Sequence, residues 1–599
     1  MEVLQALRGA LTARELLKGA TIALLLVQFL PRSTKSTPKT WTQVTVDTFV
    51  LFIFARSWLA LVDHYVPEPY LDEFFHIPQA QNYCEGRYWD WDDKITTPPG
   101  LYLLSVAYHK FWMLSKCSVF TLRYINLLAT LLTGLVAARC QSLIEARRAG
   151  RDTEDLDPFS LHVALNIALF PVIFFFSALY YTDVVSTLVV LVAYENHLRR
   201  VGPRRPGFLN DVWTALLAVA ALLMRQTNVF WVVVYMGGLE VAHAVRSLKP
   251  SPVDVPKQMS LVEHVKFYLW RDLVGDLHDP PLDEAWPEDW LFCILSIGIG
   301  ALCNPVTVLK QVWPHVTMLG LFASFVAWNG GVVLGDKSNH VATIHLAQIL
   351  YIWPFFAFFS APLLIPSVLE VFTSPFRFVN NTNGSQAKPL VLQMIRKIYY
   401  VPYILATVTL SLAIVKYNTI IHPFTLADNR HYMFYVFRYT IRRGLKIRYL
   451  LVGAYTLSRW FVWHTLAGSQ PQTTTSTKDK TVRTTTSSSP LTSTALFWLL
   501  TTTLSLITAP LVEPRYFILP WVFWRLSVPE WNPSTSSSAS LPGLKWLRNI
   551  KVDPCLALES VWFLLINLAT MYMFLFRPFY WKTPDGELLD GGNVQRFMW

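Results

Sequence analysis

The sequence is poor in charge and lacks the motifs of several common chemistries. Only 15% of its 599 residues are charged, against roughly 25% in soluble domains. It contains no Gly-rich phosphate loop, no paired His-Glu metal motif and no nucleophile elbow. Its six cysteines show no metal-binding spacing and no paired framework. Cys84 alone lies in a polar loop, where a disulfide has no obvious partner. These absences disfavour nucleotide-binding folds, metallohydrolases, serine hydrolases and disulfide scaffolds.

Apolar and aromatic residues are abundant instead. Hydrophobic residues make up 53% of the chain and aromatic residues 14%, including 23 Trp and 38 Phe. Trp and Tyr are enriched where membrane helices meet water. Apolar runs recur along the chain, many close to the roughly 20 residues that cross a bilayer. The composition therefore predicts an all-α polytopic membrane protein with roughly 12–14 transmembrane helices.

The basic residues report topology rather than a nucleic-acid partner. The net charge is +11, but Lys and Arg cluster in short loops between apolar runs, at 147–151, 197–207 and 442–448. Loops rich in Lys and Arg face the cytosol. We therefore expect no nucleic-acid binding, and we expect segment 64–100 on the opposite, lumenal or exterior, side of the membrane.

Apolar runs and composition shifts divide the chain into successive segments. We expect a cytosolic or interfacial segment at 1–44, a first transmembrane helix at 45–63, a lumenal loop with an interfacial helix at 64–118, a transmembrane core at 119–468, a Ser/Thr-rich loop at 469–490, and C-terminal transmembrane helices at 491–599 with a Ser-rich loop at 532–540. Later spans are expected near 119–138, 159–180, 184–198, 290–309, 315–334, 344–371, 400–415, 447–467, 493–512, 516–526 and 557–576. The side of the linker 372–399, which carries sequons at Asn380 and Asn383, stays open.

One long apolar stretch, 212–241, has a polar "RQTN" in its middle, at 225–228. Both of its flanks are basic, so both are predicted to face the cytosol. The stretch is then expected to enter the membrane and turn back at "RQTN". A single tilted span with a functional arginine is the alternative.

The first polar loop gathers groups that can move protons. Asp72 and Glu73 stand beside His76, followed by Gln79 and Gln81. A carboxylate at a membrane surface can act as a general base toward a sugar hydroxyl. The alternative is a pair of solvated acids in an ordinary loop.

Polar residues also occur inside and between the apolar runs. Asp183 lies at the end of a span, where it either caps a helix or meets substrate. Arg225, with Gln226 and Asn228, is deep in an apolar segment. Placing an arginine there costs roughly 2.5–3.5 kcal/mol on insertion scales, so it needs an anionic partner. A phosphate or Asp183 would both satisfy it.

Two further polar runs contain possible ligands for phosphate and sugar. Arg and His can hold phosphate, while Asp and Asn can bind hydroxyl groups. An interfacial helix beside the membrane is the alternative interpretation of the second run. The residues concerned are Asp336, Lys337 and His340 in 329–340, and Asp428, Asn429, Arg430, His431 and Tyr432 in 422–439.

Several of these motifs, in this order along the chain, resemble one known family. They are "LDEFFHIPQAQNYCEG" (71–86), "ITTPPGLY" (95–102), "LRYIN" (122–126), "YYTD" (180–183), "RQTN", "NGGVVLGDKSNH" (329–340), "ADNRHYMFY" (427–435), "EPRYFILP" (513–520) and "RFMW" (596–599). The chain is similar to the dolichyl-phosphate-glucose-dependent α-1,2-glucosyltransferases of asparagine-linked glycan assembly. The resemblance implies the C-type glycosyltransferase (GT-C) fold, a multi-pass position in the endoplasmic reticulum membrane and a lumenal active site with a catalytic first loop.

The resemblance also implies a reaction. Glucose would pass from dolichyl phosphate β-glucose to the diglucosylated, mannose-rich oligosaccharide on dolichyl pyrophosphate, forming the terminal α-1,2 linkage with inversion. The expected partners are these two lipids and the bilayer, without a metal or other cofactor. Asp72 is then expected to be the general base, with Glu73 as the alternative base or as a group that positions the acceptor. Arg225, Arg430 and His431 are candidates for the departing phosphate, and Gln79, Gln81 and Asn429 for sugar hydroxyls.

Two other classes of function remain to be weighed against the enzyme. A lipid or sugar transporter, or a scramblase, would place intramembrane charges along a path. The strongest polar cluster is in a loop, however, and no inverted repeat is visible. A non-catalytic membrane assembly subunit on the same fold is the third possibility.

Overall fold

The computed structural model describes most of the chain. The described residues are 2–28, 38–113, 116–151, 156–202, 207–248, 260–337, 343–380, 390–468, 489–509, 511–531, 553–583 and 585–599. The predictions for His340, for the sequon at Asn383 and for nearly all of the loops 469–490 and 532–540 lie outside these residues. Within them the fold is helical, with isolated β-bridges and no strand. The expected all-α fold is confirmed.

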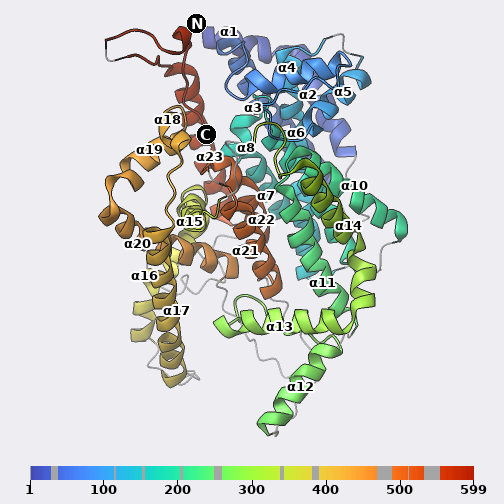
Figure 1. Cartoon of the computed structure of the whole chain (residues 1–599), viewed down its shortest axis with the longest axis vertical. Helices are drawn as coiled ribbons and strands as arrows, with labels where there is room; N and C mark the ends of the chain where they lie inside the picture. The colour runs from blue at the N-terminus through green and yellow to red at the C-terminus, as the bar shows by residue number, and fades with distance from the viewer. Residues whose placement is uncertain are drawn as a thin grey trace.

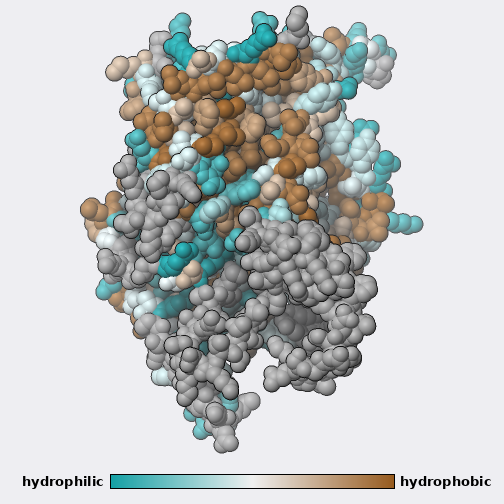
Figure 2. Space-filling model, turned by 180° about the vertical axis from the view of Figure 1, so that it is seen from behind, coloured by the Kyte–Doolittle hydropathy of each residue, from teal (hydrophilic) through white to brown (hydrophobic). Residues whose placement is uncertain are grey.

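Three described helices are long and apolar enough to cross a bilayer. They are α3 (Pro38–Tyr65), α6 (Val119–Arg148) and α23 (Pro554–Phe576). The number rises to five if each of two bent helix pairs is one span, and four shorter apolar helices accompany them. Apolar side chains form a broad band across the face seen in Figure 2, as a lipid-facing surface requires. The predicted number of 12–14 helices stays a prediction.

The core forms around α6, which packs along α7 (Pro158–Leu169) and α9 (Thr182–Arg200). The predicted span 159–180 is interrupted after α7, and α8 (Pro171–Phe176) begins at once. Proline at the first position of α8 explains the break, because it cannot donate the hydrogen bond that would continue α7. Phe170, at the break, stacks on Trp521 with 3.9 Å between the ring centroids.

The stretch around "RQTN" turns back, as predicted. It forms α10 (Phe208–Met224), then a π-helix (Phe230–Met236) that continues into α11 (Gly237–Arg246). At the end of α9, the Arg200 guanidinium donates to Asp211 of α10 at 2.6 Å and to Glu240 of α11 at 2.8 and 3.0 Å. The turn itself lies at the other end of α9, where Arg225 donates to Asp183. Both flanks of the stretch are therefore on one side.

Three predicted spans form two bent helix pairs, a geometry that differs from the one expected. The spans 290–309 and 315–334 are α13 (Pro287–Cys303) and α14 (Pro305–Asn329), which meet at 103°. The chain therefore turns at Asn304, because Pro305 starts a new helix, and α13 runs across the lower end of the molecule (Figure 1). Likewise, 344–371 is α15 (Gln348–Phe359) and α16 (Ala361–Asn380), bent by 91° at Ser360.

The remaining predicted spans are helices. They are α17 (Leu390–Tyr417), α20 (Leu445–Ala467), α21 (Thr492–Ile507) and α22 (Ile518–Ser527). Before the first span, the apolar stretch 20–30 falls largely in α2 (Ala13–Gln28), which packs against α3. Three further helices lie outside the predicted spans. They are α12 (Leu261–Leu273) and the short helices α18 (Pro423–Ala427) and α19 (Tyr432–Tyr439).

The first polar loop contains two helices joined to α6 by a disulfide. They are α4 (Glu73–Cys84) and α5 (Gly100–Phe111), which pack together at the end of the molecule opposite α12 and α13 (Figure 1). The loop 64–118, in which one helix was expected, thus contains two. Cys84 pairs with Cys117, the partner that was not obvious from the sequence. Cys117 was missed because the fold, and not sequence spacing, brings the two thiols together.

Candidate active site

The turn before α4 presents Asp72 directly after a residue with a strained backbone conformation. Leu71 has φ +51°, a left-handed value that costs about 1–2 kcal/mol for a residue with a Cβ atom. The Tyr181 hydroxyl accepts from the Asp72 backbone N–H at 3.2 Å and donates to the Tyr70 carbonyl at 3.3 Å. Strain of this kind persists only where surrounding contacts determine the conformation. The direction of the Asp72 side chain is therefore built into the turn.

Glu73, the neighbouring acid, points into the protein. Its side chain is fully buried and accepts from Arg123 at 2.6 and 2.9 Å. It also accepts from the backbone N–H groups of Tyr70 and Tyr180, at 3.0 and 2.6 Å. Arg123 in turn donates to the carbonyls of Val66 and Glu68. Glu73 and Arg123 are thus the internal anchor of the turn.

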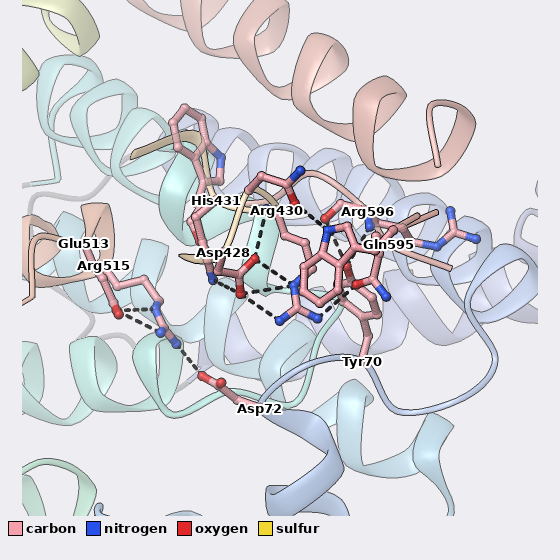
Figure 3. Close-up of polar contacts among 12 residues, drawn as sticks. Tyr70, Asp72, Asp428, Arg430, His431, Glu513, Arg515, Gln595 and Arg596 are labelled. Atoms are coloured by element: carbon pink, nitrogen blue, oxygen red, sulfur yellow. Dashed lines mark hydrogen bonds and ion pairs between the residues drawn. The ribbon is translucent and has the colours of Figure 1, made fainter. Parts of the chain in front are cut away.

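Asp72 faces an open space and is paired with an arginine from the far end of the sequence. Arg515 Nη1 donates to Asp72 Oδ2 at 2.8 Å, while 43% of the Asp72 side-chain surface stays exposed (Figure 3). Burial works to raise the pKa of Asp72, but the charges of Arg515, His76 and His431 outweigh it and hold this pKa below its usual value. Asp72 is therefore an ionised, reachable carboxylate at neutral pH.

Two further acids and a second arginine lie beside this pair. Arg515 also donates to Glu513 at 2.8 Å, and its Nη1 is 3.8 Å from Asp183 Oδ2. Asp183 is buried and accepts from Arg225 Nη1 at 2.6 Å. Asp183, the internal acid considered for Arg225, is therefore in contact with it. The site thus combines two guanidinium groups with three carboxylates.

His76 lies close to Asp72 on α4. Its Nδ1 is 2.6 Å from the hydroxyl of Tyr102 on α5. Burial lowers the pKa of His76, and although Asp72 works to raise it, the pKa stays below its usual value. His76 is therefore a neutral imidazole at neutral pH, able to donate or accept one hydrogen bond beside the open carboxylate.

The 428–432 segment forms the second half of the site. Asp428 accepts from the Arg430 guanidinium at 2.7 and 2.8 Å, and its Oδ2 is 3.7 Å from His431 Nε2 (Figure 3). Burial opposes ionisation of Asp428, but Arg430 and His431 lower its pKa. Asn429 Oδ1 accepts from the Trp581 indole at 2.6 Å, and the Tyr432 ring packs against Trp599. The predicted polar run is therefore a folded cluster around Asp428.

Four predicted ligands, all amide side chains, make hydrogen bonds to other groups of the protein. Buried backbone groups need partners, and these amide side chains supply them. Gln79 donates to the Asp90 carbonyl and accepts from the Asp92 N–H, at 2.6 and 3.0 Å. The other three donate to main-chain or hydroxyl oxygens: Gln81 to Cys117, Gln226 to Thr96, and Asn228 to Ser186 and Ala221. These amides thus make loop and helix contacts within the protein, and their roles as substrate ligands stay predictions.

The polar run 329–337 packs against the first loop. Leu334 N–H donates to the Thr96 carbonyl, which Gln226 also contacts, and Asp336 N–H donates to the Asp93 carbonyl at 2.7 Å. Lys337 is exposed, and its ammonium contacts the Asn329 carbonyl. In the described residues, this run supports the loop that contains Thr96.

Arg515, Arg123 and Tyr181 were not among the predicted site residues. Both arginines stand between apolar residues, in "EPRYFILP" and "LRYIN". The cost of burying a cation, which singled out Arg225, applies equally to them.

For metal ions, the described residues hold one close group of His, Cys and acidic ligands, namely Cys84, His109 and Cys117. Its two cysteines form the disulfide, so they offer no thiolate.

An all-helical membrane fold with an ionised acid and two arginines beyond the membrane spans has the features of a membrane-embedded C-type glycosyltransferase. The comparisons place the chain in that class. It belongs to the DIE2/ALG10 family, whose model matches residues 66–526. The family predicted from the sequence motifs is thus confirmed.

Three similar proteins are each described as "Dol-P-Glc:Glc(2)Man(9)GlcNAc(2)-PP-Dol alpha-1,2-glucosyltransferase". The protein of Neurospora crassa is 49% identical, with all of both chains covered. Those of Gibberella zeae and Pyricularia oryzae are each 46% identical, with 92% of this chain and 92% of the relative covered. No solved structure matches this chain significantly.

Proposed function

We propose that this protein transfers glucose from dolichyl phosphate glucose to the Glc₂Man₉GlcNAc₂ oligosaccharide on dolichyl pyrophosphate, forming an α-1,2 linkage. The names of its relatives give the two substrates. The observation that supports the chemistry best is the open Asp72 carboxylate, ionised beside Arg515 and near Arg225. A base next to cations is the combination that a sugar hydroxyl and a phosphate leaving group require.

Asp72 is the base in this proposal. The acceptor glucose 2-hydroxyl attacks the anomeric carbon of the donor as Asp72 Oδ takes its proton. The bond from that carbon to the phosphate oxygen breaks, and dolichyl phosphate leaves with the electron pair. Attack from the face opposite the phosphate converts the β donor linkage to the α product, so no covalent sugar–enzyme intermediate is needed. Glu73 has an anchoring role in this proposal, which its full burial and its four accepted hydrogen bonds support.

The arginines stabilise the leaving group. Arg225 keeps 19% of its side-chain surface exposed and Arg515 keeps 12%, so each can present guanidinium N–H groups to a phosphate while holding its acid. Charge-assisted bonds of this kind are about twice as strong as neutral ones. Positive charge at the departing phosphate is thereby supplied by side chains, so the proposed reaction does not call for a metal ion.

The active site is proposed to face the lumen of the endoplasmic reticulum. The Cys84–Cys117 disulfide lies in the same loop as Asp72, and disulfides form in the secretory compartments and not in the cytosol. The basic loops at 147–151 and 197–207 follow α6 and α9, both of which begin at the Asp72 side. Their charge agrees with a cytosolic position.

The test is glucose transfer by the purified protein. Dolichyl phosphate glucose and the diglucosylated lipid-linked acceptor are incubated with native protein, Asp72→Asn and Asp90→Asn. Asp90 is an exposed acid of the same loop and serves as the matched control. We expect transfer by the native and Asp90→Asn proteins and a loss of about 10²–10⁴-fold in Asp72→Asn. Full turnover by Asp72→Asn would rule out the assigned base, and no transfer by the native protein would rule out the proposed reaction.

A further inference from the structure

Residues 595–599, named here the strap, run between the two halves of the site. On one edge, the Tyr70 hydroxyl donates to the Arg596 carbonyl at 3.0 Å and accepts from the Arg596 N–H at 2.7 Å. Tyr70 is two residues before Asp72 and is itself nearly fully buried. One hydroxyl thus makes both a donor and an acceptor bond to the same residue of the strap (Figure 3).

The other edge of the strap is bonded to the 428–432 segment. Met598 N–H donates to the Arg430 carbonyl at 2.9 Å, and Tyr432 N–H donates to the Met598 carbonyl at 3.2 Å. Arg430 Nη1 donates to Gln595 Oε1 at 3.0 Å, and His431 Nδ1 lies 3.2 Å from the Trp599 carbonyl. The strap is therefore joined to the segment that contains Asp428 and His431 by a parallel β-bridge between His431 and Met598.

The Arg596 side chain fixes the strap to two membrane helices. Its guanidinium donates to the Tyr65 carbonyl at the end of α3, at 3.0 Å, and to the Phe574 and Leu575 carbonyls in the last turn of α23, at 2.9 and 3.0 Å. These carbonyls are among the last four of each helix, which have no partner within the helix. One side chain thus joins α3, α23 and the strap next to the turn that presents Asp72.

We propose that the strap is a positioning element of the catalytic site, in which Tyr70 and Arg596 hold Asp72 at its working distance from Arg515 and His431. The inference rests on the proposed function. Leu71 is strained between Tyr70 and Asp72, and Glu73 with Arg123 fixes only the inner side of the turn. Without the outer tie, the turn is free to relax toward an unstrained conformation, which moves the carboxylate away from Arg515.

The first variant is Tyr70→Phe, which removes the hydroxyl and keeps the ring that packs on Phe574. Tyr108→Phe is the matched control, because Tyr108 is a half-buried tyrosine of α5 outside the strap contacts. We expect Tyr70→Phe to lower kcat about tenfold or more, since a displacement of about 1 Å can cost 10²-fold, with KM for the donor changed less than about twofold. The melting temperature should remain that of the control.

The pH profile separates positioning from mere anchoring. The charged or titratable groups facing Asp72 are Arg515, His76, His431, Asp183, Tyr181 and Tyr102. Moving the carboxylate away from Arg515 weakens the strongest attraction on its ionised form, so its pKa rises. The acid limb of kcat/KM should therefore shift to higher pH in Tyr70→Phe and stay in place in Tyr108→Phe.

Variants of Arg596 give a second, independent test of the positioning role. Arg596→Ala should reproduce the loss of kcat, and Arg596→Lys should recover part of it, because an ammonium can still donate to the helix-end carbonyls. Normal kcat and pH profile in Tyr70→Phe would overturn the proposal. So would a lowered melting temperature with normal kcat per folded molecule, because the strap would then be an anchor only.

Hydrogen exchange keeps this test separate from the test of the reaction. Backbone amides at 70–76 should exchange faster in Tyr70→Phe than in Tyr108→Phe, whatever reaction the protein catalyses. Absence of glucose transfer by the native protein would refute the proposed function alone. Equal exchange in the two variants would refute the positioning role, even where transfer is normal.

Discussion

At the scale of single residues, Asp72 and Glu73 show how neighbouring carboxylates acquire opposite tasks. Glu73 is fully buried between Arg123 and two backbone N–H groups, whereas Asp72 keeps 43% of its side-chain surface exposed. The sequence could identify the pair as a candidate base, but residue type alone does not tell which member faces inward. That distinction depends on Arg123, which is 50 positions away from Glu73, and on the φ of Leu71.

Neutralising the buried acid should damage the fold more than the chemistry. In Glu73→Gln, the Arg123 guanidinium stays buried without its counter-charge, and breaking a buried pair costs about 3–5 kcal/mol. We expect a lower melting temperature in detergent and a lower yield of folded protein. Turnover per folded molecule should fall less than in Asp72→Asn. A Glu73→Gln protein of native stability would contradict the anchoring role.

The arginine beside Asp72 should set the acid limit of activity. A base must be ionised, and Arg515 lowers the pKa of Asp72, so the native enzyme should keep its activity down to a pH below the ordinary range of a carboxyl group. In Arg515→Gln, the pKa of Asp72 rises and the acid limb of kcat/KM moves to higher pH. Arg87→Gln, in an exposed arginine of the same loop, is the control whose profile should not move.

At the scale of helices and loops, proline residues and the disulfide determine where helices break and how the first loop is closed. The length of an apolar run predicts neither. Helices occur at nearly every apolar run predicted to be a span, and the turn at "RQTN" was predicted from the basic flanks. The breaks at Asn304 and Ser360 were missed, because a run of apolar residues has the same composition whether its helix is straight or bent by 103°. Pro305 was the available signal for the first break.

The disulfide predicts a fixed count of reactive thiols. The four free cysteines are Cys140, Cys293, Cys303 and Cys555. Alkylation of unfolded, non-reduced protein should therefore add four groups, and six after reduction. Since closing a loop of this size is worth about 4 kcal/mol, the Cys84→Ser variant should melt at a lower temperature than Cys303→Ser, a control that changes an exposed, unpaired thiol. Six groups without reduction would disprove the bridge.

At the scale of the whole molecule, separate groups of ion pairs lie at the two ends of α9. Asp183 in its first turn binds Arg225, and Arg200 in its last turn binds Asp211 and Glu240. The 17 positions between these residues span about 26 Å of helix, close to the thickness of the hydrocarbon core. In the proposed orientation the Arg200 end of α9 is the cytosolic one, which agrees with the prediction for the basic loop at 197–207.

Glycosylation tags can check this orientation. A tag inserted near residue 90 should be modified in microsomes, and one near residue 150 should not, because the basic loop there is predicted to be cytosolic. Residue 150 is at the far end of α6, whose start binds Glu73 through Arg123. The reverse pattern would invert the assignment of the active site to the lumen.

The strap also has a consequence for biosynthesis. Tyr70 and Arg596 are 526 positions apart, so a ribosome that has already inserted the Asp72 loop must still make most of the protein before that contact can form. The disulfide, by contrast, joins positions only 33 apart and can close early in translation. Chains that stop before residue 595 would therefore contain the Cys84–Cys117 disulfide but lack the strap that is proposed to hold Asp72. Under the proposed positioning role, Asp72 would be held at its working distance only after residues 595–599 have been made.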